Sequence, residues 1–201
     1  MLENIINDYL VSICILMYLI GSIPFAIITS KVFALPDPRS YGSNNPGATN
    51  VYRSGHKFAA GITLIGDFLK GYIPAILLFN SNLLNYEVYA LTYLILLGHI
   101  FPITLKFKGG KGVATYVGIL FAINIYFGLI FIVSWLITFA LSKFSSLSSL
   151  VASISIPIYL LILTQFDQVI FFAIMFVLIF FTHKENIKRL KNKEETKTKI
   201  Y

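Results

Sequence analysis

Apolar residues run along the chain in long blocks that carry almost no charge. The clearest block contains no Asp, Glu, Lys or Arg between Lys111 and Lys143. Because a hydrocarbon core of about 30 Å needs about 20 helical residues, such blocks predict helices that cross a membrane. We predict seven of them, at about residues 9–33, 58–79, 86–105, 113–127, 129–142, 149–165 and 168–183.

An alternative with five crossings merges residues 113–142 into one helix and fuses residues 149–183 into another. The first stretch is long for one helix and short for two, and Asn124 and Gly128 lie near its middle. Two short helices still span if the bilayer thins around them. The second stretch is far longer than one crossing requires. We therefore favour seven crossings.

The composition agrees with a membrane protein. The chain has 201 residues, of which 57% are hydrophobic and 12% charged, whereas a soluble domain carries about 25% charged residues. One water-soluble core of this size could not bury so much apolar surface. We predict an all-α, polytopic integral membrane protein with one transmembrane domain, residues 1–183, and a basic cytoplasmic tail, residues 184–201. The lone Cys14 allows no disulfide framework.

The basic residues predict how the chain is oriented. With the N-terminus outside, the inner segments are residues 31–57, 106–112, 143–148 and 184–201. These segments hold all of the 16 Lys and Arg residues except Lys70. Because positively charged loops stay in the cytoplasm, this bias places the C-terminal tail inside. The net charge of +7 is therefore a topology signal and not evidence for nucleic-acid binding.

Two inner loops have the composition of anion-binding segments. The first, residues 35–57, is dense in Gly, Ser, Asn and Thr, and its Arg39 and Arg53 are fork-shaped donors suited to phosphate. The second, residues 106–112, combines lysines with glycines directly before a helix, so its backbone can approach an anion closely. It lacks the spacing of a Walker A loop. The alternatives are a polar connector for the first loop and a basic turn for the second.

Polar residues also occur inside or at the ends of the predicted spans. Asp67 and Lys70 lie within the second span, where charges are candidates for a functional site, although the two can simply neutralise each other. His183 and Asn186 share one face if the last helix continues, and His183 can equally be an interfacial histidine. A break at residues 21–24 either opens a polar pocket or is a plain proline kink.

Several of these segments together resemble one known family. They are Gly21-Ser22-Ile23-Pro24-Phe25, the loop from Gly42 to Arg53, Gly98-His99 with Phe101-Pro102, the run from Phe107 to Thr115, and His183-Lys184-Glu185-Asn186-Ile187. In this order they closely resemble the bacterial PlsY family, the acyl-phosphate-dependent glycerol-3-phosphate acyltransferases. The resemblance implies transfer of an acyl group from acyl-phosphate to sn-glycerol 3-phosphate. The expected products are lysophosphatidate (1-acylglycerol 3-phosphate) and phosphate, in the first acylation of phospholipid biosynthesis.

The resemblance also implies which residues act. Those expected to be catalytic are Ser43, Arg53, Lys111, His183 and Asn186. Those expected to bind substrate are Asn45, Thr49, Asn50, Lys108, Gly109, Gly110 and Gly112, together with Ser146 or Ser149. The hydroxyl proton would go either to His183 or to the phosphate of the donor.

The same resemblance sets the expected surroundings of the enzyme. It implies a multi-pass protein of the bacterial inner membrane, with its active site facing the cytoplasm and in contact with membrane lipid. It also implies contact with the enzyme that produces acyl-phosphate. No cofactor is expected, and no cluster of Cys, His and carboxylates suggests a metal.

Two other functional classes fit the sequence less well. The His-x-x-x-x-Asp arrangement of the other large acyltransferase class is missing, because Gly61, Thr104 and Lys188 stand five positions after the three histidines. A transporter would place its binding residues near the bilayer midplane, often on repeated, broken helices. No repeat is visible here, and only Asp67 and Lys70 are midplane candidates.

Overall fold

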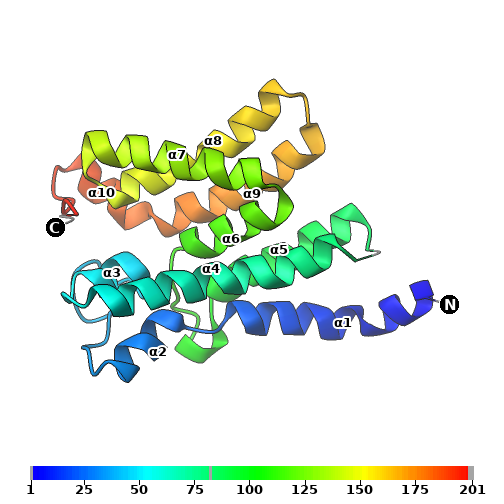
Figure 1. Ribbon diagram of the computed structural model, residues 1–201, viewed down its shortest axis with the longest axis horizontal. Helices are drawn as coiled ribbons and strands as arrows, with labels where there is room; N and C mark the ends of the chain where they lie inside the picture. The colour runs from blue at the N-terminus through cyan, green and yellow to red at the C-terminus, as the bar shows by residue number, and fades with distance from the viewer. Residues whose placement is uncertain (1, 82, 199–201) are drawn as a thin grey trace. The chain divides into compact units, whose positions relative to one another are not determined.

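The computed structural model describes residues 2–81 and 83–198, and their regular structure is helical (Figure 1). The elements are α1 (Leu2–Gly21), α2 (Phe25–Val32), α3 (Ala48–Tyr52), α4 (Lys57–Phe79), α5 (Asn85–Ile100), the 3-10 helix η1 (Ile103–Leu105), α6 (Val113–Ile123), α7 (Ile125–Ser142), α8 (Ser145–Ile162), α9 (Phe166–Thr182) and α10 (Lys184–Lys191). The all-α prediction is therefore confirmed for this part of the chain. Residues 199–201 of the predicted tail lie outside the described residues.

Four helical segments are long and apolar enough to cross a membrane, namely α4, α5 with η1, α7 and α8. Two bent pairs raise this number to six if each pair is one crossing: α1 with α2, bent by 44°, and α9 with α10, bent by 62°. The remaining apolar helix, α6, has 11 residues. At 1.5 Å per residue it is about 16 Å long, roughly half of a hydrocarbon core. If each bent pair is one crossing, the seven predicted segments are six candidate crossings and one short apolar helix.

The long apolar block after Lys111 is divided at Asn124, four residues before the glycine at which we predicted the break. The Asn124 side chain accepts a hydrogen bond from the N–H of Tyr126 at 2.9 Å and so caps the start of α7. Gly128 is instead buried inside α7. Neither this block nor the stretch 149–183 is one continuous helix, which the alternative with five crossings required.

The chain forms two compact units, Met1–Ile123 and Asn124–Tyr201. In the first unit, α4 packs against α6, α5, α2 and α3, and α1 packs against α5. Glycines allow two of these pairs to approach closely. A methyl group at Gly71 of α4 would overlap the Thr115 carbonyl of α6, and one at Gly21 of α1 would overlap the Ile95 carbonyl of α5. Such small-residue contacts are typical of helices packed in membranes.

In the second unit, α8 packs against α7 and α9, and α10 folds back against α8 and α9. The bend before α10 occurs at His183, which is the C-cap of α9. The chain after α10 returns to the start of α8, where the N–H of Thr198 donates to the Lys143 carbonyl at 3.0 Å. Large apolar side chains such as Leu141 and Ile162 remain exposed on these helices, as expected for surfaces that face lipid.

Candidate active site

The first inner loop is held in shape by the side chain of Asn50, which is buried at the start of α3. Its amide nitrogen donates to the carbonyls of Pro38 at 2.5 Å and Tyr41 at 3.0 Å, and its oxygen accepts the N–H of Ser43 at 3.0 Å. Gly42 adopts a φ of +59°, and a methyl group there would overlap the Asn50 oxygen. Asn50 was predicted to bind substrate; in this structure its amide group organises the loop and positions Ser43.

Arg53 and Arg39, the two arginines of this loop, differ in their surroundings. Arg53 ends α3, and its Cδ would lie 3.3 Å from a methyl group at Gly42, so its side chain runs beside the Ser43 turn. Arg39 instead forms an exposed ion pair with Asp37, with Nη2 2.6 Å from Oδ2. The hydrogen bonds from Arg39 hold the pKa of Asp37 below its usual value. The structure therefore sets Arg53 beside Gly42, the residue before Ser43, and pairs Arg39 with Asp37.

The second inner loop is a tight turn tied to the end of α5. The N–H of Gly110 donates to the His99 carbonyl and that of Gly109 to the Ile100 carbonyl, both at 3.1 Å. A methyl group at Gly110 would overlap the His99 ring, and one at Gly109 would overlap the His99 carbonyl oxygen. We predicted that these glycines let the backbone approach an anion; here their N–H groups point to α5, and their missing side chains allow the turn to lie on His99.

The remaining predicted residues of the first unit lie around these two loops. Asn45 is half-buried, Thr49 and Lys108 are exposed, and Lys111 is half-buried directly after the Gly109–Gly110 turn. Gly112 has a φ of +86°, and its carbonyl accepts the N–H of Tyr116 at 2.8 Å at the start of α6. Lys111 thus stands between the turn and the helix that follows it.

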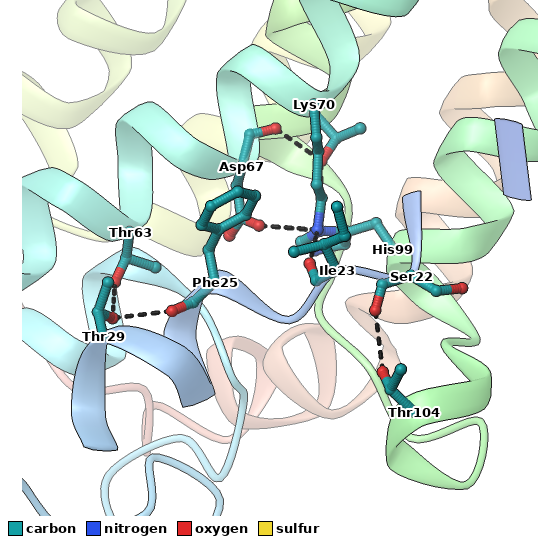
Figure 2. A network of polar contacts seen from close by, with 10 residues as sticks. Ser22, Ile23, Phe25, Thr29, Thr63, Asp67, Lys70, His99 and Thr104 are labelled. Carbon is teal, nitrogen blue, oxygen red and sulfur yellow. Dashed lines mark hydrogen bonds and ion pairs between the residues drawn. The ribbon is translucent and has the colours of Figure 1, made fainter. Parts of the chain in front are cut away.

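A buried network of charged and polar side chains (Figure 2) adjoins the second loop through His99, whose ring lies against Gly110. Lys70 Nζ lies 2.8 Å from Asp67 Oδ1 and donates to the Ile23 carbonyl at 2.7 Å. His99 Nδ1 lies 3.5 Å from the same Asp67 oxygen. The predicted mutual neutralisation of Asp67 and Lys70 is therefore observed, together with a histidine whose part in it the sequence did not indicate.

The same network reaches the break between α1 and α2. This break frees carbonyl groups that a continuous helix would use, and Thr104 donates to the Ser22 carbonyl at 2.9 Å (Figure 2). The break, the network and both loops line one small pocket. The pocket is lined by Gly21, Ser22, Ile23, Pro24, Phe25, Pro46, Asp67, Lys70, His99, Pro102, Leu105, Gly109 and Gly110. Of the two interpretations of residues 21–24, the polar pocket is the one that the structure shows.

In the second unit, the predicted residues gather around the carboxylate of Glu195. Ser146, near the start of α8, donates to Glu195 Oε1 at 2.8 Å, and the Asn186 amide of α10 donates to the same oxygen at 2.7 Å. Arg189 Nε donates to Oε2 at 2.7 Å. Burial acts to raise the pKa of Glu195, but the hydrogen bonds from Arg189, Asn186 and Ser146 outweigh it and lower the pKa. This cluster therefore stabilises an oxyanion.

His183 and Ser149 lie in the same unit and make different contacts. His183 is buried, and its Nδ1 lies 2.8 Å from the Ile179 carbonyl. Because a carbonyl only accepts, Nδ1 carries the proton, so Nε2 of the neutral ring is a proton acceptor. Ser149 donates to the Ser145 carbonyl of its own helix and accepts from Trp135 Nε1 at 3.3 Å. Of the two alternative serines, Ser146 is the one that contacts an anion.

Sequence reasoning gave no role to His99, Thr115, Arg189 or Glu195, although His99 and Thr115 lie in the motif segments that carry the family resemblance. For Arg189 the local signal was its spacing from Asn186 on one helix face. Within the part of the chain that the structure describes, no group of three His, Cys, Asp or Glu side chains is placed to hold a metal ion.

Comparison with known proteins assigns the chain to a family. A model of the glycerol-3-phosphate acyltransferase family matches residues 11–193. The chain belongs to the glycerol-3-phosphate acyltransferase family. The glycerol-3-phosphate acyltransferase of Pelagibacter ubique (strain HTCC1062) is 55% identical over 194 residues, which cover 96% of this chain and 100% of that protein.

Solved structures of a family member agree with this assignment. The crystal structure of PlsY (YgiH), an integral membrane glycerol 3-phosphate acyltransferase, in its glycerol 3-phosphate form matches with a TM-score of 0.87. It is 34% identical in sequence, and the match covers 94% of each chain. The lysophosphatidic acid form of the same protein matches with a TM-score of 0.85 at 33% identity. Membership in this family of membrane-bound acyltransferases confirms the resemblance found in the sequence.

Proposed function

We propose that this chain transfers a fatty acyl group from acyl-phosphate to sn-glycerol 3-phosphate. The products are 1-acylglycerol 3-phosphate and inorganic phosphate, and the reaction is the first acylation of phospholipid biosynthesis. Support comes from family membership and from the likeness to a relative solved in its glycerol 3-phosphate and lysophosphatidic acid forms.

The observation that carries the proposal is the cluster around Glu195. Ser146 and Asn186 were selected from the sequence as site residues, and with Arg189 they converge on one carboxylate. Hydroxyl, amide and guanidinium donors that surround a carboxylate are equally suited to the oxygens of a phosphate. Each substrate of the proposed reaction carries such a group.

The proposed acyl transfer requires the substrates to be positioned correctly and does not require a covalent acyl-enzyme. Acyl-phosphate is a mixed anhydride, so the acceptor hydroxyl attacks its carbonyl carbon, the bond from that carbon to the phosphate oxygen breaks, and phosphate departs. The residues must align hydroxyl and carbonyl and stabilise the charge that develops. We assign this stabilisation to Arg53, and we assign the binding of the glycerol 3-phosphate phosphate to Lys111 and its loop. The hydroxyl proton goes to the departing phosphate, with Nε2 of His183 as the alternative acceptor.

The proposed topology follows from the distribution of the basic residues. The N-terminus lies outside, the tail lies in the cytoplasm, and the active site faces the cytoplasm at the bacterial inner membrane. The acyl chain lies among the apolar helices. The enzyme that makes acyl-phosphate is the proposed partner, because its product is the labile donor of this reaction.

The test is an assay of donor choice. The purified chain in lipid vesicles is given glycerol 3-phosphate with acyl-phosphate, acyl-CoA or acyl carrier protein, and lysophosphatidate and phosphate are measured. Acyl-phosphate should yield both products in equal amount, and the other donors little or nothing. Comparable rates with acyl-CoA would refute the proposed donor, and vesicles without the protein provide the blank for uncatalysed transfer.

A further inference from the structure

The turn Gly109–Gly110 packs against His99. The His99 carbonyl accepts the N–H of Gly110 at 3.1 Å, and the His99 ring lies where a side chain of Gly110 would be. The turn is therefore in contact with the ring of His99 and is hydrogen-bonded to the backbone of α5. Lys111 is the next residue in the chain.

The His99 ring is fixed from its other side. Thr115 donates its hydroxyl proton to the Asp67 carbonyl at 3.0 Å, so its oxygen accepts from His99 Nδ1 at 3.2 Å. Nδ1 also faces Asp67 Oδ1 at 3.5 Å. Nδ1 consequently carries the proton, and the opposite ring nitrogen, Nε2, faces Gly110. One carboxylate and one hydroxyl thus set the orientation of the ring against the turn.

The carboxylate is held in turn by Lys70. All three ionisable side chains, Asp67, Lys70 and His99, are buried, and a lone carboxylate in such surroundings would be costly. Lys70 neutralises it at 2.8 Å and uses a second hydrogen bond on the Ile23 carbonyl at the α1–α2 break. Figure 2 shows Asp67 and Lys70 of α4 and His99 of α5 pointing toward one another, next to Ile23 at the α1–α2 break.

We propose that Asp67, Lys70 and His99 are positioning residues for the loop Gly109–Gly112, and that they set the affinity for glycerol 3-phosphate through it. This inference rests on the proposed function, since it concerns the affinity of that site. If Asp67 and Lys70 only neutralised each other, the contact from Asp67 to His99 and the hydrogen bond from Lys70 to the Ile23 carbonyl would not be required. When the network is broken, the Gly109–Gly110 turn loses its contact with His99 and Lys111 is displaced. Arg53, which is assigned to the reacting carbonyl, stays where it is.

The test separates KM from kcat in full-length protein in lipid vesicles. Asp67→Asn should raise the KM for glycerol 3-phosphate about ten-fold or more, with kcat changed by less than about three-fold. The double variant Asp67→Asn with Lys70→Met has no unpaired charge and so keeps the test valid if the single variant fails to insert. It should restore the amount of protein in the membrane while the KM stays raised.

Thr63→Val is the matched control. Thr63 lies on the same helix, is buried, and bonds Thr29 on α2 at 2.6 Å (Figure 2). Its loss should lower the thermal stability without changing the KM. A wild-type KM in the double variant, or a loss confined to kcat, would overturn the positioning role. An inactive wild-type chain would instead refute the proposed function.

A second inference comes from the tail and concerns the other unit. Glu195 occupies the anion cluster of Ser146, Asn186 and Arg189, and the chain around it is docked by Thr198 on the Lys143 carbonyl. The Ser146 hydroxyl has one proton, so it cannot donate to Glu195 and to a substrate phosphate at once. We infer that Glu195 is an internal competitor, an autoinhibitory carboxylate that must leave before a substrate phosphate binds there. This inference also rests on the proposed function.

Glu195→Gln tests this competition, because the amide keeps the shape and loses the charge. The KM for glycerol 3-phosphate or for acyl-phosphate should fall about three-fold or more at unchanged kcat. Glu194→Gln, at the exposed neighbouring residue, should leave both KM values as in wild type. A raised or unchanged KM in Glu195→Gln would show that the carboxylate supports the site or is irrelevant to it. Absence of lysophosphatidate in wild type would refute the proposed function instead.

Discussion

Gly110→Ala and His99→Ala form a double-mutant cycle that tests why the second loop contains glycine at this position. In the structure, the added methyl group of Gly110→Ala meets the His99 ring. Truncation of that ring in His99→Ala removes the obstacle. The two changes should therefore not be independent, although each alone disturbs the loop.

The size of the effect follows from the contact. Overpacking a well-packed site costs about 1–3 kcal/mol, which corresponds to about a 5- to 150-fold rise in the KM for glycerol 3-phosphate. Since His99→Ala removes the obstacle, the double variant should be no worse than the worse single variant. The coupling between the two sites should be about 1–3 kcal/mol.

The assay is the KM for glycerol 3-phosphate at saturating donor, with each variant quantified in the membrane. Gly109→Ala is the matched control, because its methyl group would meet the His99 carbonyl oxygen, which His99→Ala leaves in place. The KM increase of Gly109→Ala should multiply with that of His99→Ala, as expected for independent sites. If the KM increases of Gly110→Ala and His99→Ala also multiply in the double variant, the packing argument is wrong. Gly110 is then glycine for another reason, such as direct approach of its backbone to phosphate.

Three further predictions concern the first loop and the topology. Asn50→Ala should lower kcat about ten-fold or more, because it leaves the Ser43 N–H and two carbonyls without their partner; a wild-type kcat would refute this. Arg53→Ala should lower kcat at saturating substrates and Arg53→Lys should rescue little, whereas Arg39→Ala should remain active; equal losses at both arginines would contradict this. A single cysteine at position 143 should be labelled from the cytoplasm, and external labelling with an internal tail would overturn the proposed topology.

The sequence alone determined the class of the protein and predicted where its chemistry lies. Hydropathy and charge act over short stretches of chain, so the apolar blocks predicted helices and the loops predicted anion binding. The break at residues 21–24 and the pairing of Asp67 with Lys70 were also accessible, because the residues involved are close in sequence. Motifs that occur in a fixed order identified the family.

The tertiary structure decided what those motifs contact. Asn124 rather than Gly128 divides the long apolar block, because its side chain caps the following helix. Asn50 holds the folded first loop through its side-chain hydrogen bonds, and the N–H groups of Gly109 and Gly110 donate to carbonyls at the end of α5. These outcomes depend on hydrogen bonds that only the folded backbone brings within reach.

The same holds for His99 beneath the turn and for Glu195 between Ser146 and Asn186. Contacts of this kind join residues that carry no shared periodicity, and Glu195 lies in a tail whose composition indicates only solvation. A local pattern reports the environment that a residue prefers. The partner that it finds there is set by how the helices pack, and this is why the loops could be located from the sequence while the contacts of His99 and Glu195 could not.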